Sequence, residues 1–173
     1  MSRLTEYYRG PGTDAEGRTV AETWAFSDGE LEAVHDFIQW LFPLSEPSRF
    51  NPDAPLLTPE DVAEFRSDPL LRRNLERSFG VILGFLGLRY DGERVGPAPD
   101  FDRKQGVWRH PNHNWLRITR VLASTRMLGL EGASRAFFRF LEAERDSGRS
   151  GVTADTFRYW KEAAGPEEPA GRG

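Results

Sequence analysis

The chain has 173 residues, of which 38% are hydrophobic and 12% aromatic, so it can fill one packed core and is not a disordered chain. It contains no run of about 18 apolar residues that would cross a membrane, and its lack of cysteine excludes disulfides and thiolate chemistry. A net charge of −4 disfavours nucleic acid as a partner, and the absence of a signal peptide and of cysteine predicts a cytoplasmic location.

The first third of the chain is predicted to contain an irregular lead-in, one helix and a long loop. Residues 1–26 carry several glycine and proline turn signals and are expected to lie irregularly against the core. Ser27 and Glu30 form a capping box, and apolar residues at helical spacing continue the helix up to Pro43. Four prolines in residues 43–57 predict a long loop that forms the wall of a site.

The rest of the chain is predicted to be helical, apart from a second long loop over residues 89–109. Within this loop, Asp91-Gly92 is a candidate hairpin turn. Gly80 and Gly84 share one helix face and predict the close approach of another helix. The expected helices span residues 58–66, 68–86, 112–128, 131–145 and 153–164.

These elements predict an all-α fold class, an irregular bundle of about six helices with two long loops. No segment shows the alternation typical of a strand, and no internal repeat is present. We expect four segments along the chain: a lead-in packed on the core (1–26), a helical domain (27–146), a linker with a short C-terminal helix (147–164) and a disordered tail (165–173).

Two stretches of the chain are distinctive. HDFIQWLFPL occupies residues 35–44, and HNWLRITRVL occupies residues 113–122. In this order and spacing they resemble the conserved region of the opioid growth factor receptor family, over roughly residues 4–142. The resemblance implies a mostly helical domain. It also implies a signalling role as a peptide receptor, a label that comes from animal members of the family, which carry long repeat-rich tails. All but two of the 23 basic residues are arginine, which is typical of a GC-rich genome and indicates a microbial single-domain member.

Polar residues of the two stretches are candidates for one ligand-binding site. Arg117 and Arg120 lie three residues apart on one predicted helix, where like charges repel unless an anion lies near them. The start of this helix adds free backbone N–H groups. We therefore expect a cleft between residues 35–40, the 43–57 loop and the start of the 112–128 helix, which takes a small anionic molecule or a peptide terminus. The candidate ligand-binding residues are His35, Gln39, Trp40, His113, Asn114, Arg117 and Arg120.

Two structural alternatives stay open for these residues. The two guanidinium groups would instead pair with acids on neighbouring helices, for example Asp36, Glu32 or Asp61. His35 and Gln39 would instead bond to the backbone of the proline-rich loop and hold it in place.

Two further functions are alternatives to ligand binding. In the first, the cleft is the active site of an enzyme with His35 or His113 as general base, although the sequence indicates no reaction type. In the second, the domain is a structural module that binds a protein partner. No cofactor is expected. A metal site built from the three histidines is disfavoured, because Pro111 interrupts the helical spacing of His110 and His113. Trp40 is favoured as part of the core rather than as a ligand platform.

Overall fold

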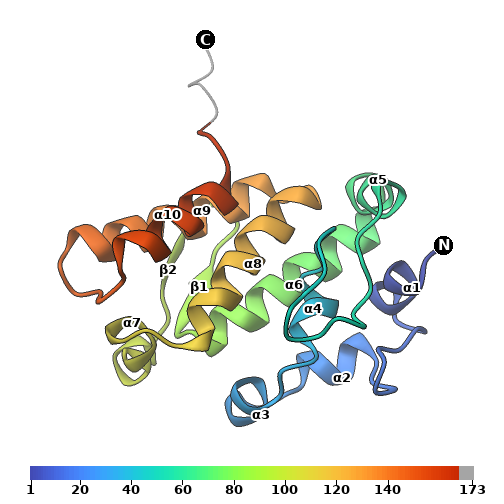
Figure 1. The fold of residues 1–173 in the computed structure, drawn as a ribbon, viewed down its shortest axis with the longest axis horizontal. Helices are drawn as coiled ribbons and strands as arrows, with labels where there is room; N and C mark the ends of the chain where they lie inside the picture. The colour runs from blue at the N-terminus through green and yellow to red at the C-terminus, as the bar shows by residue number, and fades with distance from the viewer. Residues whose placement is uncertain (168–173) are drawn as a thin grey trace.

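The computed structural model describes residues 1–167 as a mostly helical chain with one small antiparallel sheet (Figure 1). Within this range the ten α-helices span Arg3–Arg9 (α1), Val20–Trp24 (α2), Asp28–Ala33 (α3), Ile38–Leu41 (α4), Pro59–Ser67 (α5), Pro69–Phe85 (α6), Gly106–Arg109 (α7), His113–Met127 (α8), Glu131–Asp146 (α9) and Ala154–Ala164 (α10). The strands span Leu88–Tyr90 (β1) and Val95–Pro97 (β2), and a 3-10 helix spans Phe101–Lys104 (η1). The mostly helical prediction is confirmed, but about six helices were too few, and the sheet means that the fold is not strictly all-α.

Two short helices occupy the region expected to be an irregular lead-in. α1 and α2 each begin with a capping box, formed by Ser2 with Thr5 and by Thr19 with Glu22. α1 packs against α5 and α6 and buries Tyr8 completely, and the Tyr8 hydroxyl group contacts both α4 and α6. Burial of this hydroxyl raises the pKa of Tyr8. The first helix is therefore part of the core that supports α4.

The single helix predicted from Ser27 to Phe42 is two short helices in the structure. The capping box at Ser27 is confirmed. At Val34 the backbone becomes extended (φ −87°, ψ 127°), and the chain is helical again only in α4. The carbonyl groups of Leu31 and Val34 accept hydrogen bonds from Arg117 on α8. Contacts from a distant helix therefore satisfy backbone groups that a helix end leaves free, and they stabilise the break.

The hairpin turn predicted at Asp91-Gly92 is confirmed. β1 and β2 pair antiparallel with Arg89 opposite Gly96, and the Asp91 side chain accepts two hydrogen bonds from main-chain N–H groups of the turn. The close helix approach predicted at Gly80 and Gly84 is wrong, because a Cβ atom added at either position would meet no further group within 4 Å. α6 therefore carries two glycines that packing does not require.

α8 lies at the centre of the fold and packs against α6, α9 and α10 (Figure 1). Trp115 on α8 meets Trp160 on α10 edge to face, and the Trp160 indole donates a 3.0 Å hydrogen bond to the Trp115 carbonyl. Residues 42–58 connect α4 to α5 and run beside α4 (Figure 1).

Among residues 1–167, no helix combines the length and apolar character needed to span a lipid bilayer. The division of the chain into four segments stays a prediction. Of the tail expected to be disordered, residues 168–173 lie outside the described residues.

Candidate functional site

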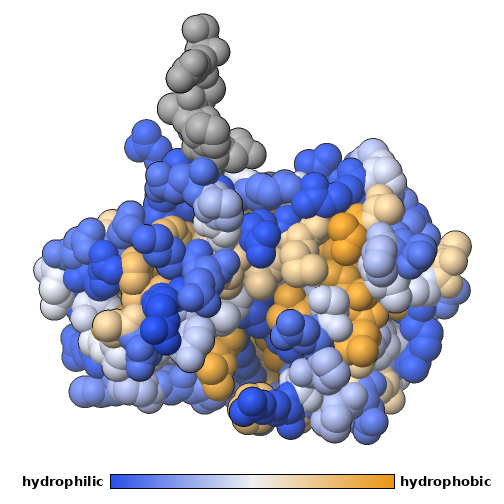
Figure 2. Space-filling view, turned by 45° about the horizontal axis from the view of Figure 1, so that its top comes forward, coloured by the Kyte–Doolittle hydropathy of each residue, from blue (hydrophilic) through white to orange (hydrophobic). Residues whose placement is uncertain are grey.

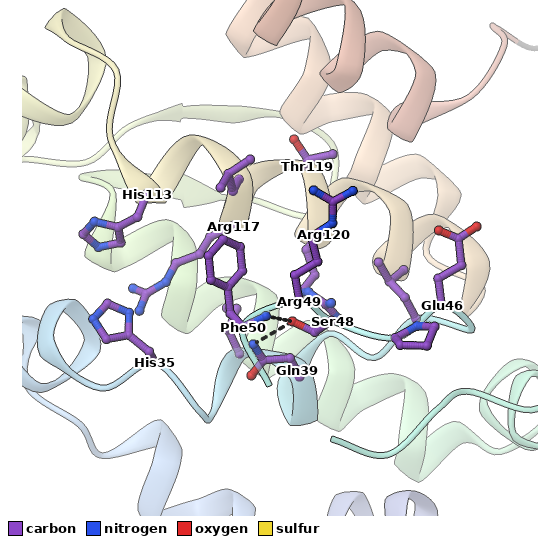
Figure 3. Close-up of a pocket in the computed structure, with 14 residues that line it drawn as sticks. His35, Gln39, Glu46, Ser48, Arg49, Phe50, His113, Arg117, Thr119 and Arg120 are labelled. Carbon is purple, nitrogen blue, oxygen red and sulfur yellow. Dashed lines mark hydrogen bonds between the residues drawn. The ribbon is translucent and has the colours of Figure 1, made fainter. Parts of the chain in front are cut away.

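A cavity of about 610 Å³ opens between α4, the 42–58 connection and the first half of α8, and we call it the α4–α8 cavity (Figure 3). Apolar surface gathers right of centre in Figure 2, on the side where Figure 1 places this connection. Of the predicted ligand-binding residues, the cavity is lined by His35, Gln39, His113, Arg117 and Arg120. Its apolar wall is formed by Ile38, Leu44, Pro47, Phe50 and Leu116.

Arg117 and Arg120 use part of their guanidinium groups to bind main-chain carbonyl groups. Arg117 is only 7% exposed, and it donates to the Leu31 carbonyl at 2.6 Å and to the Val34 carbonyl at 2.8 Å. Arg120 is half-buried and donates to the Phe42 carbonyl at 3.0 Å, at the end of α4. These bonds hold both positive charges at the cavity wall.

Neither guanidinium group forms an ion pair with a carboxylate of residues 1–167. The acids expected as their partners are engaged elsewhere: Asp36 with Arg18, Asp61 with Ser2 and Thr58, and Glu32 with His113 and Asn114. The acid-pairing alternative is therefore wrong for the described part of the chain. Carbonyl dipoles hold both guanidinium groups, and Glu32 acts on Arg117 from beyond ion-pair distance.

Each guanidinium group keeps nitrogen atoms that have no hydrogen-bond partner among residues 1–167 and are not fully buried. An arginine offers five N–H donors. Within the described residues, Arg117 Nε, Arg120 Nε and Arg120 Nη2 make no hydrogen bond. None of these three atoms is fully buried. Burial lowers the pKa of Arg117 and of Arg120, because a positive charge is less well solvated there than in water. A bound anion would compensate for this loss of solvation.

Two histidines lie next to each other at one end of the cavity (Figure 3). The ring centroids of His35 and His113 are 5.4 Å apart, and His113 Nε2 lies 3.0 Å from a carboxylate oxygen of Glu32. Partial burial lowers the pKa of His113, an effect that Glu32 opposes and that Arg117 and His35 reinforce. Within residues 1–167, no group of three or more histidine, aspartate or glutamate side chains is arranged to hold a metal ion.

Side chains hold the 42–58 connection against α4. Gln39 Nε2 lies 3.5 Å from Ser48 Oγ (Figure 3). Asn51 Nδ2 lies 3.4 Å from Gln39 Oε1. A main-chain hydrogen bond from Leu57 closes the base of the connection. Gln39 therefore contacts the loop as the second structural alternative expected, but through loop side chains rather than the loop backbone. The side chain of His35 makes no hydrogen bond to this loop in the described structure.

The sequence model of the opioid growth factor receptor conserved region matches residues 12–164. The chain belongs to this family. The opioid growth factor receptors of Homo sapiens and Mus musculus are each 36% identical to it over 128 residues, which cover 72% of this chain and 19% and 20% of the receptors. Opioid growth factor receptor-like protein 1 of Mus musculus is 32% identical over 125 residues, which cover 70% of this chain and 26% of that protein. No solved structure matches the chain.

The family expected from the two distinctive stretches is thus confirmed, and the match continues past residue 142 through α10. The chain spans between 19% and 26% of the length of the curated relatives named above. The matched region includes the whole wall of the α4–α8 cavity. The cavity is therefore built entirely from the part of the chain that defines the family.

Two predicted ligand-binding residues of this family member lie away from the cavity wall. Trp40 is 1% exposed and packs edge to face on Tyr7 in the core. Asn114 is 5% exposed, donates to Glu32 at 3.0 Å and accepts from Arg117 at 3.3 Å. Asn114 therefore positions the Arg117 guanidinium group and does not face the cavity.

Two exposed apolar residues belong to the cavity wall although the sequence patterns do not predict them. Phe50 is 78% exposed in the connection, and Leu116 is 59% exposed on α8. Phe50 lies directly after Arg49, and Leu116 lies directly before Arg117. A large apolar residue next to an arginine of the site is the only local signal that would have pointed to either position.

Proposed function

We propose that this domain is a ligand-binding module whose α4–α8 cavity takes a small anionic molecule or a peptide carboxylate. One observation carries the proposal: Arg117 and Arg120 line the same cavity with unpartnered nitrogen atoms, and no carboxylate of the described residues forms an ion pair with either guanidinium group. Carboxylate or phosphate oxygens would accept charge-assisted hydrogen bonds from these nitrogens.

The charge around the cavity supports this proposal. Arg49, Arg117 and Arg120 line the cavity, and Glu46 is the acid among its lining residues. Because two of the arginines are partly withdrawn from water, their attraction for an anion is stronger than that of a fully solvated arginine. The neighbouring amide and imidazole groups would orient the ligand by hydrogen bonds.

Family membership supports a ligand or protein partner, because the relatives are named as receptors. We do not carry the opioid peptide over to this chain, which corresponds to about a fifth of the human receptor and has the arginine-rich composition of a GC-rich microbial genome. A cytoplasmic location is part of the proposal and is supported by the absence of cysteine, which suits a reducing compartment.

A thermal-shift and native mass spectrometry screen of the full chain tests the proposal. The library would contain anionic metabolites and blocked dipeptides with free carboxylates. The Arg120→Met variant should lose the stabilisation given by a hit, whereas Arg73→Met, which changes an exposed arginine of α6, should keep it. Hits that are uncharged, or that bind Arg120→Met as well as the original chain, would refute the proposal.

An enzyme working in the same cavity is the second candidate, and the contact between Glu32 and His113 favours it. A carboxylate 3.0 Å from an imidazole orients the ring and partly offsets the lowering of the His113 pKa that burial causes. Turnover of a bound substrate that His113→Gln abolishes without loss of binding would establish this candidate. Binding of the same compound without turnover would refute the enzyme and support the ligand-binding module.

A further inference from the structure

The apolar wall of the α4–α8 cavity narrows the class of ligand. Phe50 and Leu116 line the cavity together with Arg117 and Arg120, yet they are 78% and 59% exposed. Exposed apolar side chains that gather at a cavity with a few polar groups are typical of a binding site for an organic molecule. In Figure 3 the Phe50 ring points from the connection toward Arg117, so the apolar and charged parts of the wall adjoin.

The size of the cavity argues against a simple inorganic anion. A volume of about 610 Å³ corresponds to roughly 20 water molecules at about 30 Å³ each, so one phosphate or acetate ion would fill a small part of it. A small polyanion would fill more of the space, but it would place charge against the apolar wall and lose hydration there. A molecule with one anionic group and an apolar body matches both parts of the wall.

We propose that the cavity binds a monocarboxylate with an aliphatic or aromatic body. The carboxylate receives hydrogen bonds from the open nitrogens of Arg120 and Arg117, and the body packs against Phe50 and Leu116. This inference rests on the proposed function, because it names the ligand class of the same site. The same chemistry is offered by a free organic acid and by a peptide that ends in an apolar residue.

Isothermal titration of the full chain with four probes tests the ligand class. Octanoate carries the charge and the apolar body, acetate carries only the charge, and octan-1-ol carries only the body. N-acetyl-Ala-Leu offers the same chemistry on a main-chain carboxylate. Each methylene group buried on binding is worth a factor of about 3 to 4 in affinity, so octanoate should bind at least a hundredfold more tightly than acetate.

Two pairs of matched variants locate the bound groups. Arg120→Met should weaken octanoate binding at least tenfold and should leave octan-1-ol unaffected, with Arg73→Met as the control. Leu116→Gln should weaken octanoate severalfold and leave acetate unaffected, with Leu70→Gln on α6 as the control for another exposed helical leucine. Because Leu116 is exposed, this variant keeps its fold even if Arg120→Met does not.

The outcomes separate this inference from the proposed function. If acetate and octanoate bind equally well and Arg120→Met weakens both, the cavity binds anions but the inference of an apolar body is overturned. If octan-1-ol binds as tightly as octanoate, or if no carboxylate binds, the inference is overturned. The proposed function is overturned as well only if no anion of the metabolite screen binds in an Arg120-dependent way. If N-acetyl-Ala-Leu binds more tightly than octanoate, the ligand class stands and its source is a peptide terminus.

Discussion

Replacing Arg117 by methionine should destabilise this domain more than the same change at Arg120, the other arginine of α8 in the cavity wall. The side chain is 7% exposed and donates to the carbonyl groups of Leu31 and Val34 at 2.6 and 2.8 Å. Methionine keeps most of the apolar length but leaves both carbonyl groups without this donor. A buried polar group that loses its partner costs about 1–3 kcal/mol, so we expect Arg117→Met to lower the free energy of unfolding by about 3 kcal/mol.

Arg120→Met is the matched comparison, because Arg120 lies one turn further along α8. It makes a single hydrogen bond, to the Phe42 carbonyl at 3.0 Å, and it is half-buried, so water can replace it. We expect a loss of about 1 kcal/mol. Urea unfolding followed by far-UV circular dichroism measures both values. The reasoning is refuted if Arg117→Met costs no more than Arg120→Met, or if amide hydrogen exchange in residues 34–38 does not become faster in Arg117→Met.

Three further predictions concern stability, pH dependence and loop motion. Gly80→Ala should raise the free energy of unfolding by about 0.5–1 kcal/mol, because Gly80 lies inside a helix with free space around it. Gly87→Ala should lower the free energy of unfolding, because φ at Gly87 is +79° and a Cβ atom would lie 3.1 Å from Phe101. Urea denaturation checks both variants, and equal effects would contradict this account. The lowered pKa of His113 means that the unfolded chain binds a proton at this residue more readily than the folded chain, so the free energy of unfolding falls as pH decreases through about 6.5. His113→Gln should remove this part of the pH profile of unfolding. A variant with an unchanged profile would show that other groups cause the fall. Gln39→Leu should speed amide exchange at the Phe50 end of the connection, because it removes the two side-chain contacts that tie the loop to α4; unchanged exchange there would show that the main-chain bond at the base of the loop is sufficient.

Where the helices begin and end was largely predictable, because the signals are local. The capping box at Ser27, the proline after Thr58 and the apolar spacing of α6, α8 and α9 all act within a few residues of one another. The hairpin at Asp91-Gly92 has the same local origin. The two capping boxes of α1 and α2 are equally local, but these helices are only seven and five residues long and their apolar spacing is too short to stand out.

The candidate site also has features that the sequence predicts and features that depend on the tertiary structure. The sequence by itself predicted that His35, Gln39, His113, Arg117 and Arg120 share one cleft, from their spacing in the two distinctive stretches, and all five line the α4–α8 cavity. Only the tertiary structure decided how these side chains are used. The helix predicted from Ser27 to Phe42 is interrupted where Arg117 binds the carbonyl groups of Leu31 and Val34, and Asn114 contacts Glu32 instead of facing the cavity.

The physical reason lies in the range of the interactions. Capping and helical periodicity depend on residues three or four positions apart, which the sequence displays directly. The bonds from Arg117 to Leu31 and Val34 join residues 86 and 83 positions apart. Likewise, Leu116 lines a cavity because the 42–58 connection lies opposite it, a placement that depends on how α4 and α8 pack and that no spacing within α8 encodes.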